Sequence, residues 1–172
     1  MKDLEILITE EEIQKRVKEL AEELYQEYKD EEVVFICTLK GAVFFACDLL
    51  KKYPSHNAIL EFIKISSYIG EESSGKVTLN LEVKKENIEN KHVIIIEDIV
   101  DTGRSLDYLT KHILEMKPKT LKTCALLDKK MKRVVDIDPD YVGFEIDDYF
   151  VIGYGLDDEQ KRRNLPYIGV KK

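Results

Sequence analysis

The segment HVIIIEDIVDTGRSL, residues His92–Leu106, carries the strongest structural and chemical signal in this chain. Its four consecutive β-branched residues, Val93–Ile96, are typical of a central parallel strand that is buried on both faces. We expect this strand to end on two adjacent carboxylates, Glu97 and Asp98, and an apolar pattern of helical spacing begins at Leu106. Because ligands bind at the carboxyl ends of strands and phosphates bind at helix N-termini, the segment predicts an acidic pair beside a phosphate site.

The turn between this strand and the helix, Asp101–Ser105, contains the residue types that bind a phosphate group. Thr102 and Ser105 supply hydroxyl donors, and Gly103 allows a positive φ or a close approach of a ligand to the backbone. Successive N–H groups in such a turn attract an anion at the positive end of the helix dipole, and Arg104 adds positive charge nearby. An ordinary turn capped by an aspartate or a serine is the alternative. The two preceding carboxylates favour a ligand site, because buried carboxylates need hydroxyl or cation partners.

The sequence EDIVDTGRSL resembles the phosphoribosyl-pyrophosphate signature of the type I phosphoribosyltransferases. The rest of the chain, from about Ile6 to Val170, resembles the hypoxanthine-guanine branch of that family in its short bacterial form. The further motifs that carry the resemblance are Leu39-Lys40-Gly41, Ser66-Ser67-Tyr68, Lys129, Val142–Glu145 and Phe150–Asp157. The resemblance implies an α/β fold, with a central, mainly parallel sheet flanked by helices and a small hood subdomain formed by the N- and C-terminal pieces.

The same resemblance implies an activity. Enzymes of this branch transfer the 5-phosphoribosyl group from phosphoribosyl pyrophosphate to a 6-oxopurine, hypoxanthine or guanine, and the products are IMP or GMP and pyrophosphate. We therefore expect a purine-salvage glycosyltransferase that uses Mg²⁺ and acts on small molecules in the cytoplasm. The family also suggests a homodimer or a homotetramer.

Two motifs are implied by the resemblance to bind pyrophosphate. The turn at Lys40 and Gly41 would bind it through backbone amides, and in the family the peptide bond before this lysine is cis. Ser67 and Tyr68 would contact it from a mobile loop, residues 67–76, that closes over the reacting centre. Without the resemblance, the first motif is also compatible with a tight strand-to-helix turn, and the loop with a plain hairpin connection.

Three residues are implied to recognise the purine. Lys129 would donate to the 6-oxo group, Phe150 would stack on the ring, and the backbone of Val151 would contact the edge of the base. Asp157 aligns with the second magnesium site of the family, and Arg163 aligns with its pyrophosphate-binding arginine. Without the resemblance, the default interpretation of Lys129 is an exposed lysine, and Phe150 is compatible with a core residue. Asp157 and Arg163 in isolation favour surface charges, so their roles rest mainly on the resemblance.

The expected chemistry assigns roles to the signature itself. Ribose C1 loses pyrophosphate and gains a purine nitrogen through a transition state with oxocarbenium character, so both developing charges need fixed partners. Glu97 and Asp98 would hold the ribose hydroxyls and, with Asp157, help to place Mg²⁺, which prefers oxygen ligands. Thr102–Ser105 would anchor the 5′-phosphate and so fix C1 relative to the base. Asp101 is the candidate general base for the purine N7 proton, with a helix-capping aspartate as the alternative.

Chain length, hydropathy and cysteine placement limit the number of domains and the expected cellular location. The chain has 172 residues, which we expect to form one domain, residues 1–172, with a sizeable core. No apolar run approaches the roughly 20 residues of a membrane helix, and the start MKDLEILITEEE is too acidic for a signal peptide. Cys37, Cys47 and Cys124 lie in apolar stretches without CxxC spacing, which favours reduced thiols of a cytoplasmic protein.

The net charge of −7 comes entirely from residues 1–32, which hold 12 acidic and 5 basic side chains. The remainder is balanced, and its basic run, Lys129–Arg133, has the composition of a solvated loop. A nucleic-acid-binding protein usually has a basic face, so we expect no nucleic-acid partner and no membrane partner. Two other classes stay open: a regulatory protein of the same fold that binds a nucleotide and then RNA or DNA, and a non-catalytic module that resembles a receiver domain.

Periodicity predicts the remaining elements. Thr9 and Glu12 form a capping box in front of a helix whose apolar stripe runs from Ile13 to Tyr28. The other predicted elements are strands over 33–38, 58–66, 77–83, 123–127, 141–145 and 150–154 and a helix over 42–52. Asp147-Asp148-Tyr149 and Asp158 depart from the family pattern near the base pocket, so the ranking of hypoxanthine, guanine and xanthine stays open.

Overall fold

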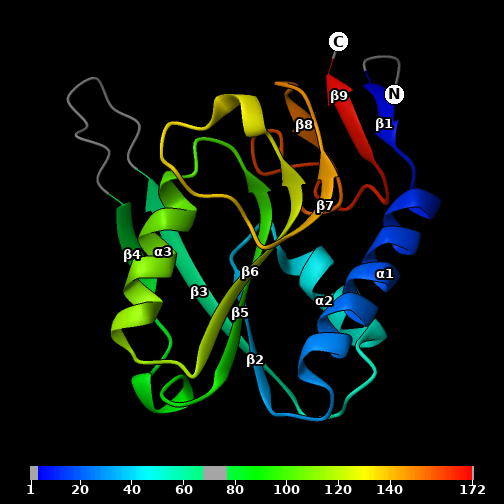
Figure 1. Ribbon diagram of the computed structural model, residues 1–172. Coiled ribbons are helices and arrows are strands. Elements are labelled where there is room, and N and C mark those ends of the chain that lie inside the picture. Colours follow the sequence, from blue (N-terminus) through cyan, green and yellow to red (C-terminus); the bar gives the residue numbers. More distant parts are fainter. Residues whose placement is uncertain (1–3, 68–76, 172) are drawn as a thin grey trace.

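The computed structural model describes residues 4–67 and 77–171 as an α/β arrangement of strands and helices (Figure 1). The strands are β1 (Leu4–Ile8), β2 (Val33–Thr38), β3 (Ala58–Ser67), β4 (Val77–Leu81), β5 (His92–Val100), β6 (Thr120–Asp128), β7 (Tyr141–Glu145), β8 (Val151–Ile152) and β9 (Ile168–Lys171). The helices are α1 (Glu10–Tyr28), α2 (Val43–Lys52) and α3 (Arg104–Glu115), with the short 3-10 helices η1 (Lys85–Asn87) and η2 (Lys130–Lys132). The predicted α/β class is confirmed.

The central sheet has the strand order β4-β3-β2-β5-β6-β7, and β4 runs antiparallel to β3 while the other neighbours are parallel. From β2 the chain passes through α2 to β3 on one side, and from β5 it passes through α3 to β6 on the other. The order of the strands therefore reverses between β2 and β5. Such a switch point opens a crevice at the carboxyl ends of the strands, where ligands bind in folds of this class.

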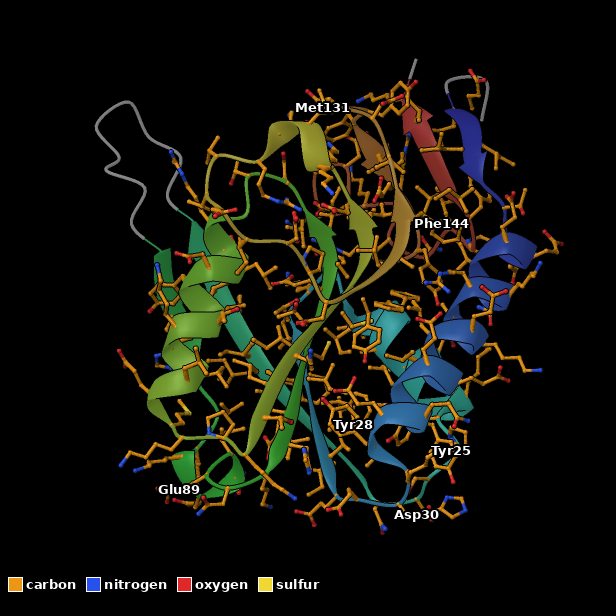
Figure 2. All side chains as sticks on the ribbon, in the orientation of Figure 1. Tyr25, Tyr28, Asp30, Glu89, Met131 and Phe144 are labelled. Carbon is orange, nitrogen blue, oxygen red and sulfur yellow. The ribbon has the colours of Figure 1, made fainter. Side chains whose placement is uncertain are left out.

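Helices α1 and α2 cover one face of the central sheet, and α3 covers the other (Figure 1). Alternate residues of β2 divide between the two cores, since Phe35 packs with α1 and α2 whereas Ile36 packs with α3. Every residue of β2 is buried, as expected for a strand covered on both faces. Side chains fill the space between α1 and the sheet in Figure 2, where Tyr28 points toward the strands; the centroid of its ring lies 5.1 Å from that of His92.

Helix α1 begins and packs as its sequence predicts. The backbone N–H of Glu12 donates to Thr9 Oγ1 at 3.2 Å, and the N–H of Thr9 donates to the Glu12 carboxylate at 2.8 Å, which completes the capping box. The buried residues of the helix are Ile13, Val17, Leu20, Ala21, Leu24 and Tyr28. Their spacing places the apolar side chains on the face that packs against the sheet.

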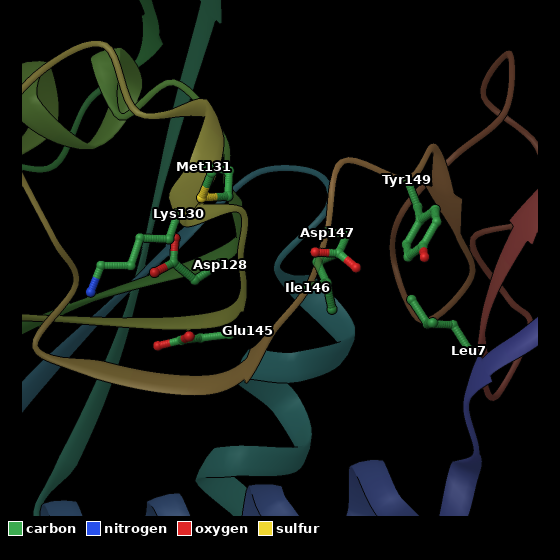
Figure 3. A pocket seen from close by; sticks show the side chains of 8 residues that line it. All are labelled: Leu7, Asp128, Lys130, Met131, Glu145, Ile146, Asp147 and Tyr149. Atoms are coloured by element: carbon green, nitrogen blue, oxygen red, sulfur yellow. The ribbon is translucent and has the colours of Figure 1, made fainter.

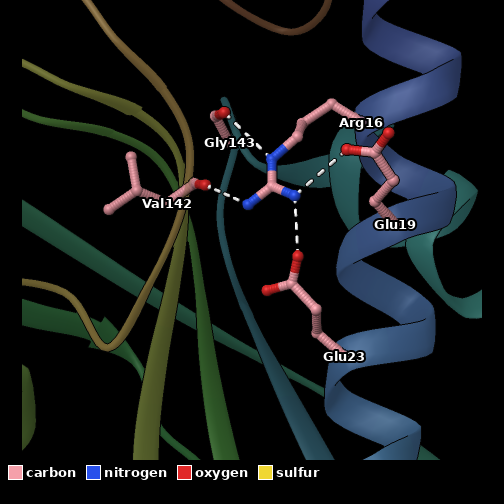
Figure 4. Close-up of polar contacts among 5 residues, drawn as sticks. All are labelled: Arg16, Glu19, Glu23, Val142 and Gly143. Atoms are coloured by element: carbon pink, nitrogen blue, oxygen red, sulfur yellow. Dashed lines mark hydrogen bonds and ion pairs between the residues drawn. The ribbon is translucent and has the colours of Figure 1, made fainter.

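Arg16 ties α1 to the edge of the central sheet (Figure 4). Its Nε donates to the carbonyl of Gly143 at 3.1 Å, and its Nη2 donates to the carbonyl of Val142 at 2.8 Å. On the helix side, Nη1 pairs with Glu19 at 3.2 Å and with Glu23 at 2.7 Å. One guanidinium therefore holds two backbone carbonyls of β7 against α1.

Strand β5 is longer than its apolar run. The sequence predicts an end at Glu97 and Asp98, but the strand extends to Val100, so this boundary was wrong. Pairing with β2 stops at Ile96, whereas β6 continues to pair with β5 and places Glu97 opposite Ala125. Because adjacent residues of a strand point to opposite faces, the two carboxylates leave the sheet on different sides.

The two ends of the chain meet in a second, three-stranded antiparallel sheet with the order β1-β9-β8. In Figure 1 it lies at the end of the molecule toward which β5 and β6 point. Strand β8 is shorter than the predicted 150–154, because Gly153, Tyr154 and Gly155 have φ values of 99°, 47° and 105°. A strand cannot continue through a left-handed backbone, so the chain turns there into the loop that carries Asp157.

The three cysteines are free thiols, with Cys37 and Cys124 buried and Cys47 half-buried. Burial raises the pKa of Cys37 to about 12, so this thiol stays protonated at neutral pH and is a poor nucleophile. Across residues 4–67 and 77–171, no helix is both long enough and apolar enough to span a lipid bilayer.

Candidate active site

Glu97 lies where the carboxyl ends of β2 and β5 meet, and Thr38 of β2 contacts it directly. The Thr38 hydroxyl lies 2.7 Å from Glu97 Oε2 and 2.8 Å from the carbonyl oxygen of Ile96. The Thr38 hydroxyl donates toward both oxygens, so its one proton is shared between two acceptors and satisfies Glu97 Oε2 only in part. The other carboxyl oxygen, Oε1, is buried and has no hydrogen-bond partner within the described chain. Glu97 is therefore an incompletely satisfied acid that a ligand hydroxyl or a cation would complete.

Burial also sets the ionisation of both acids. It raises the pKa of Glu97 from 4.5 to about 8, the nearby charge of Asp98 adds to this rise, and the hydrogen bond with Thr38 opposes it. Burial likewise raises the pKa of Asp98, against the lowering effect of the Ile99 N–H, which donates to Oδ1 at 2.9 Å. Without a ligand, the site therefore favours protonation of these two acids. A bound cation would favour their ionised forms instead.

We expect the Glu97→Gln variant to be more stable than the wild type at about pH 8, with the difference shrinking toward about pH 5. Between the unfolded pKa of 4.5 and the folded value of about 8, the folded wild type keeps a proton that the unfolded chain loses, so its stability falls as pH rises. The uncharged glutamine does not titrate. Thermal unfolding at both pH values should show a melting-temperature gain of about 5 °C at the higher pH.

The control for this prediction is Glu145→Gln at an exposed position of β7. Its melting temperature should differ from that of the wild type by the same small amount at both pH values. A stability difference between Glu97→Gln and the wild type that does not change with pH would contradict a neutral Glu97.

The turn after β2 packs directly on Asp98. The Leu39-Lys40 peptide bond is cis, as the family resemblance implies. Gly41 is buried, and a Cβ at this position would lie 1.5 Å from Asp98 Oδ2. On its other side, a Cβ on Gly155 would lie 1.9 Å from the Gly41 carbonyl oxygen. The turn after β2, Asp98 and the loop after β8 therefore pack in one layer. Neither Gly41 nor Gly155 has space for a side chain in it.

The loop after β8 places Asp157 and Arg163 beside the same turn. Arg163 Nη2 pairs with Asp157 Oδ1 at 2.7 Å, and it also donates to the side-chain oxygen of Gln160 at 3.3 Å. That oxygen accepts a second hydrogen bond, from Lys40 Nζ at 3.1 Å. The charge of Arg163 lowers the pKa of Asp98 and the charge of Asp157 raises it, so both groups lie within electrostatic reach of this acid. The two segments predicted to bind pyrophosphate, the Lys40-Gly41 turn and the loop with Arg163, thus converge beside Asp98.

The predicted phosphate-binding turn surrounds a cavity of about 80 Å³. Its lining residues are Glu97, Ile99, Val100, Asp101, Thr102, Gly103, Ser105 and Leu106. Gly103, with φ 83°, caps α3 without a side-chain hydrogen bond, so the alternative of an aspartate or serine cap is wrong. The N–H groups of Thr102, Gly103 and Ser105 have no acceptor among the described residues. Arg104 is exposed and does not line the cavity.

Asp101 lines this cavity, and a chain of ion pairs through Lys132 and Asp148 connects it to Lys129. Its Oδ1 is buried without a hydrogen-bond partner from the described chain, and its Oδ2 lies 3.8 Å from Lys132 Nζ. Lys132 pairs with Asp148 Oδ1 at 2.7 Å, and Lys129 Nζ lies 3.5 Å from the same oxygen. Lys129 is only 7% exposed, so the alternative of an exposed lysine is wrong.

The aromatic candidate Phe150 is 58% exposed, which contradicts the alternative of a core residue, and Val151 is buried in β8. Beside these residues lies a larger cavity of about 530 Å³ (Figure 3). It is lined by Leu7, Asp128, Lys130, Met131, Glu145, Ile146, Asp147 and Tyr149. Because neither Lys129 nor Phe150 lines it, this cavity lies next to the predicted purine site and not within it. Ser67 ends β3, while Tyr68 and the rest of the predicted loop lie outside the described residues.

Two residues that shape the site were missed by the sequence analysis. Thr38 reads as the last residue of a strand, and only the pairing of β2 with β5 brings its hydroxyl to Glu97. Arg133 lies in the run interpreted as a solvated loop, but its side chain is only 11% exposed and its Nη1 donates to the carbonyl of Asp101 at 2.6 Å. No local pattern marks either residue, because both contacts join segments far apart in the sequence.

Known proteins share both the sequence and this geometry. The family of the phosphoribosyl transferase domain matches residues 5–159, and the Bacillus subtilis hypoxanthine-guanine phosphoribosyltransferase is 46% identical over 168 residues, covering 97% of this chain and 92% of the relative. This chain belongs to the hypoxanthine-guanine phosphoribosyltransferase family. The hypoxanthine-guanine-xanthine phosphoribosyltransferase of Tritrichomonas foetus is 44% identical over 174 residues, covering 100% of this chain and 94% of the relative. A crystal structure of a Bacillus anthracis hypoxanthine-guanine phosphoribosyltransferase superposes with a TM-score of 0.93 at 43% identity, over 99% of each chain.

The carboxylates of this phosphoribosyltransferase fit a metal site in which the substrate supplies part of the ligands, rather than a site built from protein side chains alone. Among the described residues, no group of three or more His, Cys, Asp or Glu side chains is arranged to hold a metal ion. Mg²⁺ is usually bound through one or two carboxylates together with substrate phosphates and water. The unpartnered Oε1 of Glu97 and the neighbouring Asp98 are oxygen donors of the kind that such a site requires.

Proposed function

We propose that this phosphoribosyltransferase transfers the 5-phosphoribosyl group from phosphoribosyl pyrophosphate to a 6-oxopurine and releases pyrophosphate. The observation that carries this proposal is the cavity at the end of β5, where Thr102, Gly103 and Ser105, whose amides have no acceptor among the described residues, share a lining with Glu97. A phosphate monoester accepts hydrogen bonds from N–H donors at a helix N-terminus, and a sugar hydroxyl can donate to a buried acid that lacks a partner. A ribose 5-phosphate group can make both contacts at once.

The sugar and pyrophosphate roles follow from this placement. Amides of the turn bind the 5′-phosphate, and the acids at the end of β5 hold the ribose hydroxyls. The Lys40-Gly41 turn and Arg163 lie on the other side of Asp98, where they bind the leaving pyrophosphate. Their positive charge stabilises the negative charge that develops on the leaving group in the transition state.

The purine roles are assigned to residues around Asp101. Lys129 donates to the 6-oxo group, Phe150 stacks on the ring, and the backbone of Val151 contacts the edge of the base. Because an ammonium carries three N–H donors, the 3.5 Å contact of Lys129 with Asp148 leaves donors for the purine oxygen. Asp101, whose Oδ1 has no hydrogen-bond partner in the described chain, accepts the N7 proton.

We assign Glu97, Asp98 and Asp157 as the carboxylates that would hold Mg²⁺ together with the substrate. When bound, this ion supplies charge neutralisation for the pyrophosphate and ribose oxygens. We further propose that the β1-β9-β8 sheet acts as a hood over the site. The loop predicted to close it, residues 67–76, lies outside the described residues apart from Ser67.

Release of pyrophosphate tests the proposed function. The purified chain is mixed with Mg²⁺, phosphoribosyl pyrophosphate and one purine at a time: hypoxanthine, guanine, xanthine or adenine. We expect Mg²⁺-dependent release with hypoxanthine and guanine and none with adenine. The xanthine reaction tells whether the specificity matches the name of the Tritrichomonas foetus relative or that of the Bacillus subtilis relative. No release with any 6-oxopurine refutes the proposal.

We expect Lys129→Ala to raise KM for hypoxanthine and guanine by about 10- to 100-fold, because a charged hydrogen bond to the 6-oxo group is lost. The KM for phosphoribosyl pyrophosphate should change little, since the lysine lies on the purine side of the site. Steady-state kinetics with each substrate varied in turn measure both constants. Lys130→Ala, at the exposed neighbouring position, is the control, and equal losses for both substrates would contradict purine recognition by Lys129.

A further inference from the structure

Arg133 lies under the phosphate-binding turn, in a position that none of the roles above explains. Its guanidinium reaches back from the loop after η2, with Nη1 donating to the carbonyl of Asp101 at 2.6 Å. Its Nη2 pairs with the carboxylate of Asp128, whose side chain is only 4% exposed. A Cβ on Gly103 would lie 2.8 Å from Arg133 Cδ, so the glycine leaves the space that this arginine fills.

The next residue extends the same contact, because the N–H of Val134 donates to the carbonyl of Thr102 at 3.0 Å. In a trans peptide, the carbonyl and the following N–H point in opposite directions. With the carbonyls of Asp101 and Thr102 held by the loop, the N–H groups of Thr102 and Gly103 must point away from it. The cavity lies on that side, since its lining includes Asp101–Gly103 but neither Arg133 nor Val134.

We propose that Arg133 is a positioning residue for phosphate binding, which aims the amide donors of the turn at the 5′-phosphate by fixing the peptide between Asp101 and Thr102. The inference rests on the proposed function, in which this turn binds the 5′-phosphate. Asp128, the last residue of β6, pairs with the guanidinium, so the position of Arg133 is fixed by a strand of the central sheet. Donors fixed in this way do not have to reorganise when the anion binds.

The test compares IMP with inosine, which lacks the phosphate, by titration calorimetry on the wild type and on Arg133→Met. We expect the affinity for IMP to fall by about 10- to 100-fold, as for a lost charged hydrogen bond, and the affinity for inosine to stay unchanged. In turnover, KM for phosphoribosyl pyrophosphate should rise by a similar factor while KM for hypoxanthine does not. A structural defect alone would lower the active fraction and leave both KM values unchanged.

Arg16→Met is the matched control, because Arg16 also donates to two backbone carbonyls and pairs with carboxylates, but on the α1 side of the sheet. It should bind IMP as the wild type does. Arg133→Lys keeps the charge but has a single donor nitrogen in place of the guanidinium fork, so it should fold even where Arg133→Met does not, and it should lose IMP affinity to a smaller extent. Unchanged IMP affinity in both Arg133 variants, or equal losses for IMP and inosine, overturns the proposal. A wild type that binds no IMP refutes the proposed function instead.

Discussion

Replacement of Asp101 by alanine is expected to lower kcat by about 10²–10⁴-fold, with a modest change in the KM for phosphoribosyl pyrophosphate. The side chain lines the phosphate cavity, and its Oδ1 is buried without a partner in the described chain, so it is available to accept a proton. Its backbone carbonyl is already held by Arg133, which leaves the turn in place when the side chain is removed. Pre-steady-state and steady-state rates with hypoxanthine measure the effect.

Asp101→Asn separates basicity from shape, since asparagine keeps the size of the side chain but cannot take the N7 proton. It should lose nearly as much kcat as the alanine variant. Asp107→Asn is the control, because this carboxylate lies in the first turn of α3 and pairs at 2.7 Å with Lys111. Near-normal turnover in either Asp101 variant would remove this residue from the mechanism.

The parts of the fold that depend on local patterns could be predicted from the sequence. The capping box at Thr9, the buried strand Val33–Thr38 and the turn with positive φ at Gly103 all rest on residues within a few positions of one another. Motif resemblance added the cis bond before Lys40, which no local pattern would have indicated. The capping box, the strand and the turn agree with the structure because each is specified by residues that are neighbours in the chain.

The parts that depend on contacts between distant segments could not be predicted. The sequence indicates two carboxylates side by side, whereas continued pairing with β6 sends Glu97 and Asp98 to different faces of the sheet. Thr38 reaches Glu97 from the neighbouring strand β2, and Arg133 reaches the phosphate turn from a loop with the composition of a solvated segment. Such contacts follow from register and packing, which a single sequence does not specify locally.

Gly41→Ala is the most severe test of how the pyrophosphate side is built. The new Cβ would lie 1.5 Å from Asp98 Oδ2, so the carboxylate must move by more than its own bond length. A displacement of about 1 Å at a reacting centre costs about 10²-fold, and we therefore expect kcat/KM to fall by at least that factor. Overpacking of the same layer should destabilise the protein by about 1–3 kcal/mol, measured by chemical unfolding.

The control for Gly41→Ala is Gly169→Ala in β9, where the nearest atom to the new Cβ is the Glu5 carbonyl oxygen at 3.3 Å. That variant adds the same methyl group to a strand outside the crevice, so it should cost some stability and leave the kinetics unchanged. If Gly41→Ala keeps wild-type kinetics, Asp98 does not need its present position and cannot hold the ribose as assigned. If instead only the KM for phosphoribosyl pyrophosphate rises, the turn acts in binding and the acid tolerates displacement. A loss in kcat therefore indicates that the position of Asp98 matters for the reaction, whereas a rise in KM alone indicates that the Lys40-Gly41 turn matters for binding phosphoribosyl pyrophosphate.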